Sequence, residues 1–280
     1  MMNKDNKIKV GGTNYQALVN LSPVNKRIVI KEYQGDVVAL ADKLIKLARE
    51  NDFTKIWAKA YSKDQAAFEK AGFLTEAVIT EFYPTDDALS MAYYLSDKRS
   101  KMNNKAQKED LLDKVTGLEV KESSKLTSDY QFKIAGQEDV SQLAKLYDKV
   151  FNSYPYPIDN PSYLQKMIES DVIYGLIYDD DQLVAAASAE TVPAYKNAEM
   201  TDFATLSEYR GQGLAAYLLR RLEAELKKRD YRSLYTIARA KVMGINKIFS
   251  QAGYEYTGTL VKNCEIAGGL EDMNLWCKVI

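Results

Sequence analysis

The chain has 280 residues with 38 basic and 39 acidic side chains, which leaves a formal net charge of −1. This balance gives no general attraction to nucleic acid or to anionic membranes, so neither is expected as a partner. The sequence contains no histidine, which excludes hydrolases with an imidazole base and nearly all catalytic zinc sites. No metal is therefore expected, and any proton transfer must use carboxylate, tyrosine, lysine, cysteine or water.

Two domains are expected, because the chain is longer than a single hydrophobic core usually supports. Residues 98–128 are charged and polar with short apolar interruptions, which is typical of a surface linker. The boundaries are accordingly placed at 1–97, 98–128 and 129–280. The longest apolar stretches, such as 183–189, fall far short of the ~20 residues that span a bilayer, and no secretory signal is recognisable. A cytoplasmic protein is the default expectation.

The N-terminal part has the pattern strand, helix, strand, helix, strand, strand. Apolar residues at helical spacing follow Asp36, which suits an N-cap, and Gly72 suits a helix end. The expected elements are a strand at 27–33, a helix at 36–50, a strand at 55–61, a short helix at 63–72, and strands at 74–83 and 88–95.

The C-terminal part opens with a strand at 130–136, a helix at 137–151 and a hairpin over 172–190. From residue 198 onward the order strand, helix, strand, helix, strand, strand appears again, which indicates a divergent internal repeat. The elements of this second copy are expected at 198–207, 213–229, 232–239, 245–253, 254–263 and 272–280. The first copy has a single glycine between its first strand and helix, in YQGDVV, so a cofactor is expected in the second copy.

The second copy has the turn RGQGLA, from Arg210 to Ala215, between its first strand and helix. Such a turn presents unpaired backbone N–H groups at the positive end of a helix dipole, and its small residues let a pyrophosphate come close. A glycine-rich turn without a ligand is the alternative. A dinucleotide-binding fold is disfavoured, because no strand with an acidic end follows at the required distance.

Several separated segments resemble the GCN5-related N-acetyltransferase (GNAT) superfamily. RGQGLA matches its R/Q-x-x-G-x-G/A signature, and NKIFSQAGY at 246–254 is similar to its late helix. Within the superfamily, the β-lysine N-acetyltransferases are resembled by segments 151–164, 199–215, 258–266 and 271–278, and their N-terminal extension by 72–100. The resemblance implies an α/β (α+β) fold: a mixed, mostly antiparallel twisted sheet flanked by helices, preceded by a smaller degenerate GNAT-like domain.

The same resemblance implies transfer of an acetyl group from acetyl-CoA to the terminal amine of β-lysine, which gives N-acetyl-β-lysine, a compatible solute. Two alternatives stay open. One is acetylation of another small amine or of a protein N-terminus, and the other is a catalytically inactive CoA-binding sensor or scaffold. The N-terminal domain would cover the catalytic domain or a partner in a homodimer, or would contribute one wall of the acceptor pocket.

In this superfamily, backbone N–H groups at the end of the strand before the signature hold the pantetheine, and the signature holds the pyrophosphate. Carried onto this sequence, the resemblance gives as cofactor-binding residues Ala204, Thr205, Leu206, Arg210, Gly211, Gln212, Gly213, Leu214, Ala215, Asn246 and Phe249. Arg239 and Lys241 either meet the CoA phosphates or are solvated charges.

Without histidine, the base that deprotonates the amine is expected to be a carboxylate, with Glu199, Asp202 and Glu190 as candidates. Alternation along a strand separates Glu199 from Asp202, so only one of them should face the acceptor, and Glu199 is preferred. Superfamily members commonly place a tyrosine general acid where this chain has Phe249, which leaves the acid unassigned.

The acceptor site is expected around the loop after the first helix of the C-terminal part, where this fold usually shapes it. The expected substrate-binding residues are Asn152, Tyr154 and Tyr156 in that loop, and Asn263 and Asn274 on the last two strands. For each group the alternative is a packing or turn-forming role. The two cysteines, Cys264 and Cys277, lack metal-ligand spacing and are expected as reduced thiols.

Overall fold

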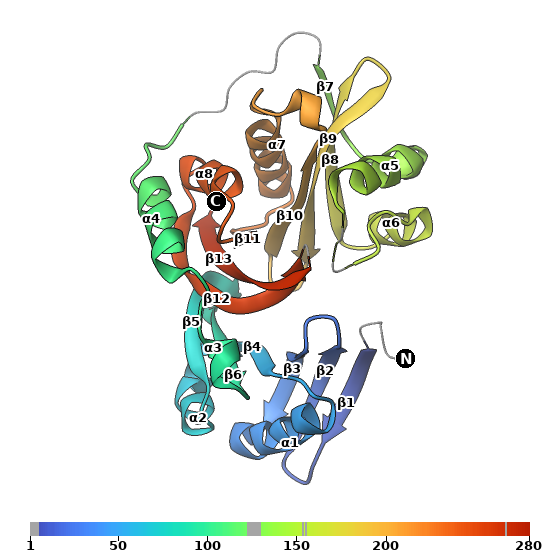
Figure 1. Ribbon diagram of the computed structural model, residues 1–280. Helices are drawn as coiled ribbons and strands as arrows, with labels where there is room; N and C mark the ends of the chain where they lie inside the picture. The colour runs from blue at the N-terminus through green and yellow to red at the C-terminus, as the bar shows by residue number, and fades with distance from the viewer. Residues whose placement is uncertain (1–5, 122–129, 153, 155, 267) are drawn as a thin grey trace.

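The computed structural model describes residues 6–121, 130–152, 154, 156–266 and 268–280. They form a six-stranded sheet in the N-terminal part and a seven-stranded sheet in the C-terminal part (Figure 1), here called the N-terminal and C-terminal domains. The first sheet consists of β1 (Asn6–Gly11), β2 (Tyr15–Ser22), β3 (Arg27–Gly35), β4 (Lys55–Tyr61), β5 (Leu74–Tyr83) and β6 (Asp86–Tyr94). The second consists of β7 (Tyr130–Ile134), β8 (Val172–Asp179), β9 (Gln182–Val192), β10 (Asn197–Thr205), β11 (Ser233–Arg239), β12 (Glu255–Ile266) and β13 (Gly269–Val279). The α-helices are α1 (Val37–Glu50), α2 (Gln65–Lys70), α3 (Asp97–Ser100), α4 (Lys105–Thr116), α5 (Val140–Val150), α6 (Pro161–Ile168), α7 (Leu214–Lys228) and α8 (Met243–Gln251).

Both sheets have the same strand order. The N-terminal sheet runs β1-β2-β3-β4-β6-β5, and the C-terminal sheet runs β8-β9-β10-β11-β13-β12 with β7 added beside β8. Within the described residues each sheet has one parallel pair, β3 with β4 and β10 with β11, and its other pairs are antiparallel. The expected mixed, mostly antiparallel architecture is confirmed. Strands β1 and β2 and helix α6 are additions that the sequence patterns did not predict.

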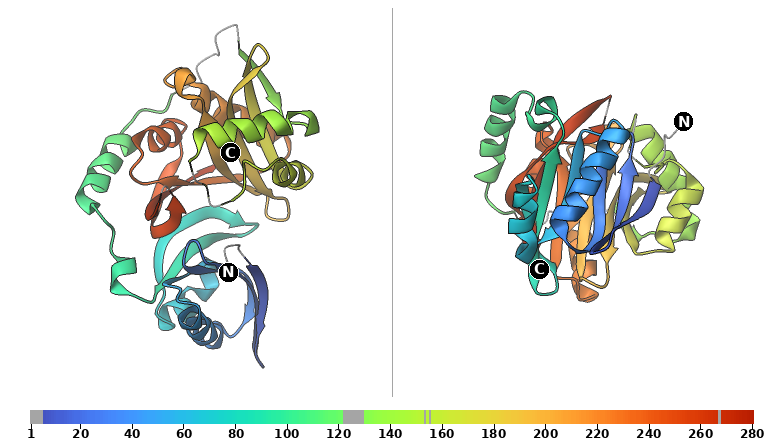
Figure 2. Two further views of the ribbon diagram at one scale, coloured as in Figure 1. Left: turned by 45° about the vertical axis from the view of Figure 1, so that its right-hand side comes forward. Right: turned by 90° about the horizontal axis from the view of Figure 1, so that it is seen from below.

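Helices cover both faces of the C-terminal sheet. α5 and α6 lie on one side of it, and α7 and α8 on the other (Figure 1). The buried face of α7 repeats at helical spacing, which places the helix firmly on the sheet, and includes Leu214, Leu218, Leu219, Leu222 and Leu226. In the N-terminal domain, α1 covers the face of the sheet that is turned away from the C-terminal domain (Figure 2).

The segment between the two sheets contains α3 and α4. α4 packs on α8, where the hydroxyl of Ser250 donates a hydrogen bond to the carbonyl of buried Val115 (2.5 Å). Much of the expected linker therefore contacts the C-terminal domain, because α4 has an apolar residue to bury. Residues 122–128 of that linker lie outside the described residues, and its boundaries stay a prediction.

The N-terminal domain packs against β12, the edge strand of the C-terminal sheet. Lys55 and Glu76 form a buried ion pair (2.8 Å). The Lys55 ammonium also donates to the carbonyl of Val261 (3.0 Å), and the Glu76 carboxylate accepts from the Val261 N–H (2.7 Å). At Gly258 on β12, a Cβ would lie 2.0 Å from the carbonyl oxygen of Glu76. The domains are thus in close contact, and polar groups of an edge strand are satisfied by the other domain.

An apolar cluster shared by both domains lies beside this polar contact. Its buried members are Val29, Trp57, Ala77, Ile79, Phe82, Tyr83 and Ala88 from the N-terminal domain and Tyr235, Leu260, Met273, Leu275 and Cys277 from the C-terminal domain. Cys264 and Cys277 are free thiols. None of the described helices has the length and apolar character that crossing a membrane requires.

Candidate active site

The turn before α7 contains two glycines with left-handed backbone, Gly211 (φ 81°) and Gly213 (φ 82°). Glycine adopts this conformation without the steric cost that a Cβ brings. None of the backbone N–H groups from 211 to 216 donates a hydrogen bond within the described part of the chain, and no side chain caps the helix. These groups lie at the positive end of a 15-residue helix, so the turn has the arrangement of an anion-binding site.

Strands β10 and β11 pair only where they begin. Their register runs from Asn197 with Ser233 to Glu199 with Tyr235, while β10 continues to Thr205. The N–H of Leu206 donates to the carbonyl of Val184 in β9, so by alternation the N–H of Thr205 points toward the gap between β10 and β11. The N–H of Leu206 is thus already used and that of Thr205 faces the opening, while the predicted contact with the pantetheine stays a prediction.

A β-bulge between Thr201 and Ala204 changes which way Asp202 points. Glu199 lies opposite Glu190 in the strand register, and Asp202, with a φ of 53°, accepts a hydrogen bond from the hydroxyl of Ser188 (2.7 Å). Ser188 lies two residues before Glu190, on the same face of β9. The expectation that only one of Glu199 and Asp202 faces the acceptor is therefore wrong, because the bulge interrupts the alternation. Glu190, Glu199 and Asp202 form one cluster, here called the carboxylate cluster.

Electrostatics within the carboxylate cluster favour protonation. Glu190 can be reached by solvent, but the protein that surrounds it reduces its hydration, and together with the like charges of Glu199 and Asp202 this raises the pKa of Glu190 to about 8. Burial also raises the pKa of Asp202, although hydrogen bonds from Tyr154 and Ser188 oppose this. A carboxylate with a pKa near neutrality is suited to accept a proton. Within the described residues, no group of three or more acidic or cysteine side chains is arranged to hold a metal ion.

Tyrosines from α5 and the loop after it close one side of the carboxylate cluster. The hydroxyl of Tyr154 donates to Asp202 (2.5 Å). Tyr147 on α5 is fully buried, and its hydroxyl has no hydrogen-bond partner among the described residues. Burial first, and the negative charge of Asp202 second, raise the pKa of both hydroxyls, so both stay protonated. They can act as hydrogen-bond donors next to the cluster.

Two lysines of the N-terminal domain approach the carboxylate cluster from the other side. The ammonium of Lys59 donates to the hydroxyl of Tyr235 (2.6 Å), the residue that lies beside Glu199 in the sheet. The charges of Glu199 and Glu190 act on both Lys59 and Lys31. No residue of this domain was predicted for the site. The signal was Lys59 in the middle of the strand KIWAKAY, which also begins with a lysine, but what such a lysine faces depends on domain packing.

A comparison with known protein families shows that residues 140–247 match the acetyltransferase (GNAT) family. The beta-lysine N(6)-acetyltransferase of Methanococcus maripaludis is 37% identical over 263 residues, which are 94% of this chain and 96% of that protein. The chain belongs to the GNAT family of acetyltransferases. The N-acetyltransferase YodP of Bacillus subtilis is 33% identical, over 94% of this chain and 95% of that protein. The beta-lysine N(6)-acetyltransferase of Methanosarcina mazei is 32% identical, over 89% and 100%.

Three predicted ligand residues of this acetyltransferase are buried and used within the protein. The amide nitrogen of Asn246 donates to two backbone carbonyls where β11 leads into α8, and its oxygen accepts from Asn274 and Trp276 (both 2.9 Å). Asn274 in turn accepts from the hydroxyl of Thr259 (2.8 Å). Phe249 is fully buried in the apolar core. These side chains join strands to helix, and these internal contacts give no support to the CoA contacts predicted for Asn246 and Phe249 or to the substrate contact predicted for Asn274, which stay predictions.

The remaining predicted acceptor residues are distributed over two places. Tyr154 contacts the carboxylate cluster through Asp202, while Asn152 and Tyr156 are exposed on the same loop, and their role stays a prediction. Asn263 is buried at the contact with the N-terminal domain, where its carbonyl accepts from Arg27 (2.5 Å). That hydrogen bond is made by the backbone of Asn263, and the substrate contact predicted for its side chain stays a prediction.

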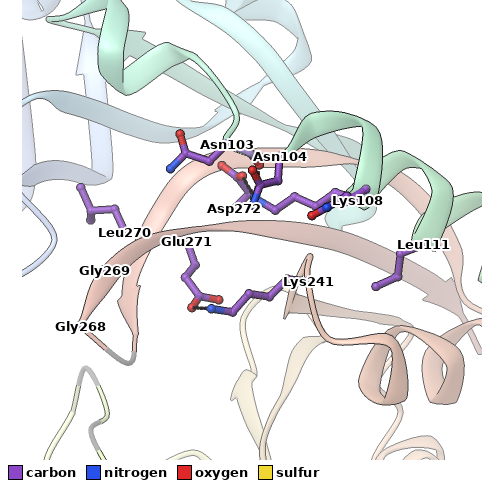
Figure 3. A pocket seen from close by; sticks show the side chains of 11 residues that line it. Asn103, Asn104, Lys108, Leu111, Lys241, Gly268, Gly269, Leu270, Glu271 and Asp272 are labelled. Atoms are coloured by element: carbon purple, nitrogen blue, oxygen red, sulfur yellow. Dashed lines mark hydrogen bonds and ion pairs between the residues drawn. The ribbon is translucent and has the colours of Figure 1, made fainter.

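A cavity of about 460 Å³ lies between α4 and the turn from β12 to β13 (Figure 3). Its charged side chains pair with one another: Lys108 with Asp272, and Lys241 with Glu271 (2.5 Å). Glu271 also accepts two hydrogen bonds from Arg239 (2.8 and 2.7 Å). The acetyltransferase therefore uses Arg239 and Lys241 to neutralise Glu271, and the prediction that they meet CoA phosphates finds no support.

Proposed function

We propose that the enzyme transfers the acetyl group of acetyl-CoA to the terminal amine of β-lysine, which yields N6-acetyl-β-lysine. The observation that carries this proposal is the carboxylate cluster beside the gap between β10 and β11. Three carboxylates in a partly enclosed site attract a substrate with more than one ammonium group, and β-lysine has two. Two relatives that match over nearly their full length are named beta-lysine N(6)-acetyltransferases, which supports this acceptor.

The turn and the gap suit the two halves of acetyl-CoA. The unbonded N–H groups from 211 to 216 would hold the pyrophosphate, and the Thr205 N–H would meet the pantetheine or the thioester oxygen. Two side chains of the turn fix its shape. Arg210 donates to the carbonyl of Thr205 (3.2 Å), and Gln212 accepts from the hydroxyl of Tyr130 (2.6 Å).

The carboxylate cluster supplies the proton acceptor. Glu190 and Glu199 lie directly opposite each other, so the charge of Glu199 acts on Glu190, and we assign the pair as the general base. The pair takes a proton from the ammonium, the freed nitrogen bonds to the acetyl carbon, and the carbon–sulfur bond breaks. The nitrogen loses its second proton as the amide forms, and water carries a proton to the departing thiolate, which is a good leaving group because an ordinary thiol has a pKa of ~8.5. Phe249 cannot supply that proton.

The reaction also changes the charge of the substrate. β-Lysine carries two ammonium groups and one carboxylate, and acetylation of one amine leaves a product of zero net charge. A polar molecule without net charge can accumulate without disturbing the ionic balance of the cytoplasm. This property supports a role for the product as a compatible solute, and a cytoplasmic location for the enzyme.

The test is an acceptor panel. Purified enzyme is given acetyl-CoA with β-lysine, lysine, spermidine or a peptide, free CoA thiol is followed over time, and mass spectrometry locates the acetyl group. We expect the fastest release with β-lysine and acetylation at N6. Faster release with another amine or with the peptide would replace the proposed acceptor, and binding of CoA without turnover with any amine would indicate a sensor or scaffold.

A further inference from the structure

One face of the N-terminal sheet directs lysines at the C-terminal domain. In the parallel pair β3 and β4, Val29 lies beside Trp57, and both belong to the apolar cluster shared by the domains. Lys59 follows Trp57 by two residues and so lies on the same face of β4. Lys31 follows Val29 at a bulge in β3, where the register with β2 shifts between Ile30 and Glu32, and it lines a cavity between the domains together with Lys59. α1 covers the opposite face (Figure 2). The two lysines therefore point toward the C-terminal domain.

Lys59 is held close to Glu199 without touching it. Its ammonium donates to Tyr235 and lies over the rings of Phe82 (4.9 Å to the centroid) and Tyr235 (4.5 Å). Tyr235 is the register partner of Glu199, so one aromatic ring separates the cation from the carboxylate cluster. An ammonium group can donate three hydrogen bonds. Among the described residues, the ammonium of Lys59 donates one, to the hydroxyl of Tyr235.

The opposite charges face each other but remain unpaired. In the described part of the chain, no ion pair within 4.0 Å joins Lys31 or Lys59 to any carboxylate, and none involves Glu190 or Glu199. Their influence on each other is still felt: loss of hydration lowers the pKa of Lys59 to about 8, while the charges of Glu199 and Glu190 oppose that shift. Because these charges are not in contact, there is room between them for a ligand that carries both a positive and a negative group.

A cavity of about 660 Å³ lies between the domains. Lys31 and Lys59 line it from the N-terminal sheet, and Val192 and Tyr195 line it from the hairpin that joins β9 to β10. Val192 lies two residues after Glu190 on the same face of β9, so the cavity extends toward the carboxylate cluster. The wall from the N-terminal sheet carries Lys7, Lys31 and Lys59 against one carboxylate, Glu32, so its net charge is positive, while the cluster next to it is anionic.

We infer that Lys59, with Lys31, binds the carboxylate of the amino-acid substrate while the carboxylate cluster binds its ammonium groups. The inference rests on the proposed function and assigns the specificity for an amino acid, as opposed to a simple diamine, to the N-terminal domain. The degenerate copy of the repeat is then half of the acceptor site. A carboxylate that entered the cavity would take the free donors of the Lys59 ammonium and offset the lost hydration of both lysines.

The experiment compares three acceptors that differ at one end. They are β-lysine with its carboxylate, the carboxamide of β-lysine, in which this group is neutral, and 1,4-diaminopentane, which has no carboxylate. Lys59→Met removes the charge and keeps an unbranched side chain, and Lys31→Gln changes an exposed position. Lys46→Gln on the exposed face of α1 is the matched control. The measured quantity is kcat/KM for each enzyme with each acceptor, together with the melting temperature.

We expect Lys59→Met to lower kcat/KM for β-lysine by about 10- to 100-fold and to leave the carboxamide nearly unchanged. Lys31→Gln should have a smaller effect of the same kind, and Lys46→Gln none. An equal loss with all three acceptors would overturn the inference, because it would show a structural role only. So would a wild-type enzyme that uses β-lysine and its carboxamide equally well.

Failure of the proposed function gives a different result. A wild-type enzyme that acetylates neither β-lysine nor its analogues refutes the function itself, and the inference with it. Activity with β-lysine combined with an unchanged ratio of acid to carboxamide in the lysine variants refutes the inference alone. If Lys59→Met does not fold, Lys31→Gln decides the question by the same ratio, because an exposed side chain can be changed without unfolding the domain.

Discussion

Replacing Glu190 by glutamine tests the proposed base, because it removes the carboxylate and keeps the shape of the side chain. Lost hydration, and then the charges of Glu199 and Asp202, raise the pKa of Glu190 to about 8. Below that pH the group is mostly protonated, so wild-type kcat/KM should rise about tenfold per pH unit and level off above pH ~8. In Glu190→Gln, kcat/KM on the plateau should fall by about 100- to 10,000-fold, the usual contribution of a general base.

The assay is the initial rate of CoA thiol release with β-lysine, measured from about pH 6 to about pH 10. The amine of the substrate also titrates in this range, and the ratio of wild type to variant at each pH cancels that contribution. Glu169→Gln, at an exposed carboxylate just after α6, is the matched control and should follow the wild type. A ratio that stays constant across the range would refute the reasoning, because Glu190 would then not be the group whose ionisation limits the rate.

Three further changes test the turn, the domain contact and the electrostatics. Gly213→Ala places a Cβ at a φ of 82°, which should raise the conformational energy of the turn by about 1–2 kcal/mol. Calorimetry should then show weaker binding of acetyl-CoA, and an unchanged affinity would argue against the anion-binding turn. Gly258→Ala puts a Cβ 2.0 Å from the carbonyl of Glu76, so the free energy of unfolding should fall by about 1–3 kcal/mol in denaturant titrations. Gly244→Ala is the control and should show no such loss, because its Cβ would have no atom within 4 Å. Equal values for the two variants would contradict the close domain contact. The pKa of Glu190 is raised from 4.5 to about 8 in the folded state, so the folded chain binds this proton more tightly and wild-type stability falls as pH rises through that window. The melting temperature of Glu190→Gln minus that of the wild type should therefore increase as pH rises from 4.5 to about 8. A difference that does not change with pH would show that the neighbours of Glu190 do not raise its pKa.

The features that the sequence predicted correctly depend on local patterns. The second copy of the repeat was recognisable because its strands and helices keep clear periods and end at glycines such as Gly253. The turn at Gly211 and Gly213 was recognisable because positive φ values need residues without a Cβ. Strands β1 and β2 were missed, since pairing with β3 defines them more than their own composition does.

The features that the sequence did not predict depend on contacts between distant segments. Period-two alternation cannot foresee that Asp202 adopts a φ of 53° in a bulge, and this single residue turns three separate carboxylates into a cluster. Asn246 resembled a ligand in the linear sequence, but its partners Asn274 and Trp276 lie on β13, 28 and 30 residues away. Lys59 reaches the cluster only because the two domains pack together.

The two copies of the repeat satisfy the start of their central helix in different ways. In the N-terminal copy the side chain of Asp36 accepts from the N–H of Ala39, and the N–H of Asp36 binds the carbonyl of Asn14. Gly35 packs so closely there that a Cβ would lie 2.1 Å from that carbonyl oxygen. In the C-terminal copy the N–H groups from 211 to 216 find no partner among the described residues. A helix start must be satisfied by a cap, by water or by a ligand, so the cap by Asp36 is a physical reason to expect one acetyl-CoA site per chain and a first copy free for substrate recognition.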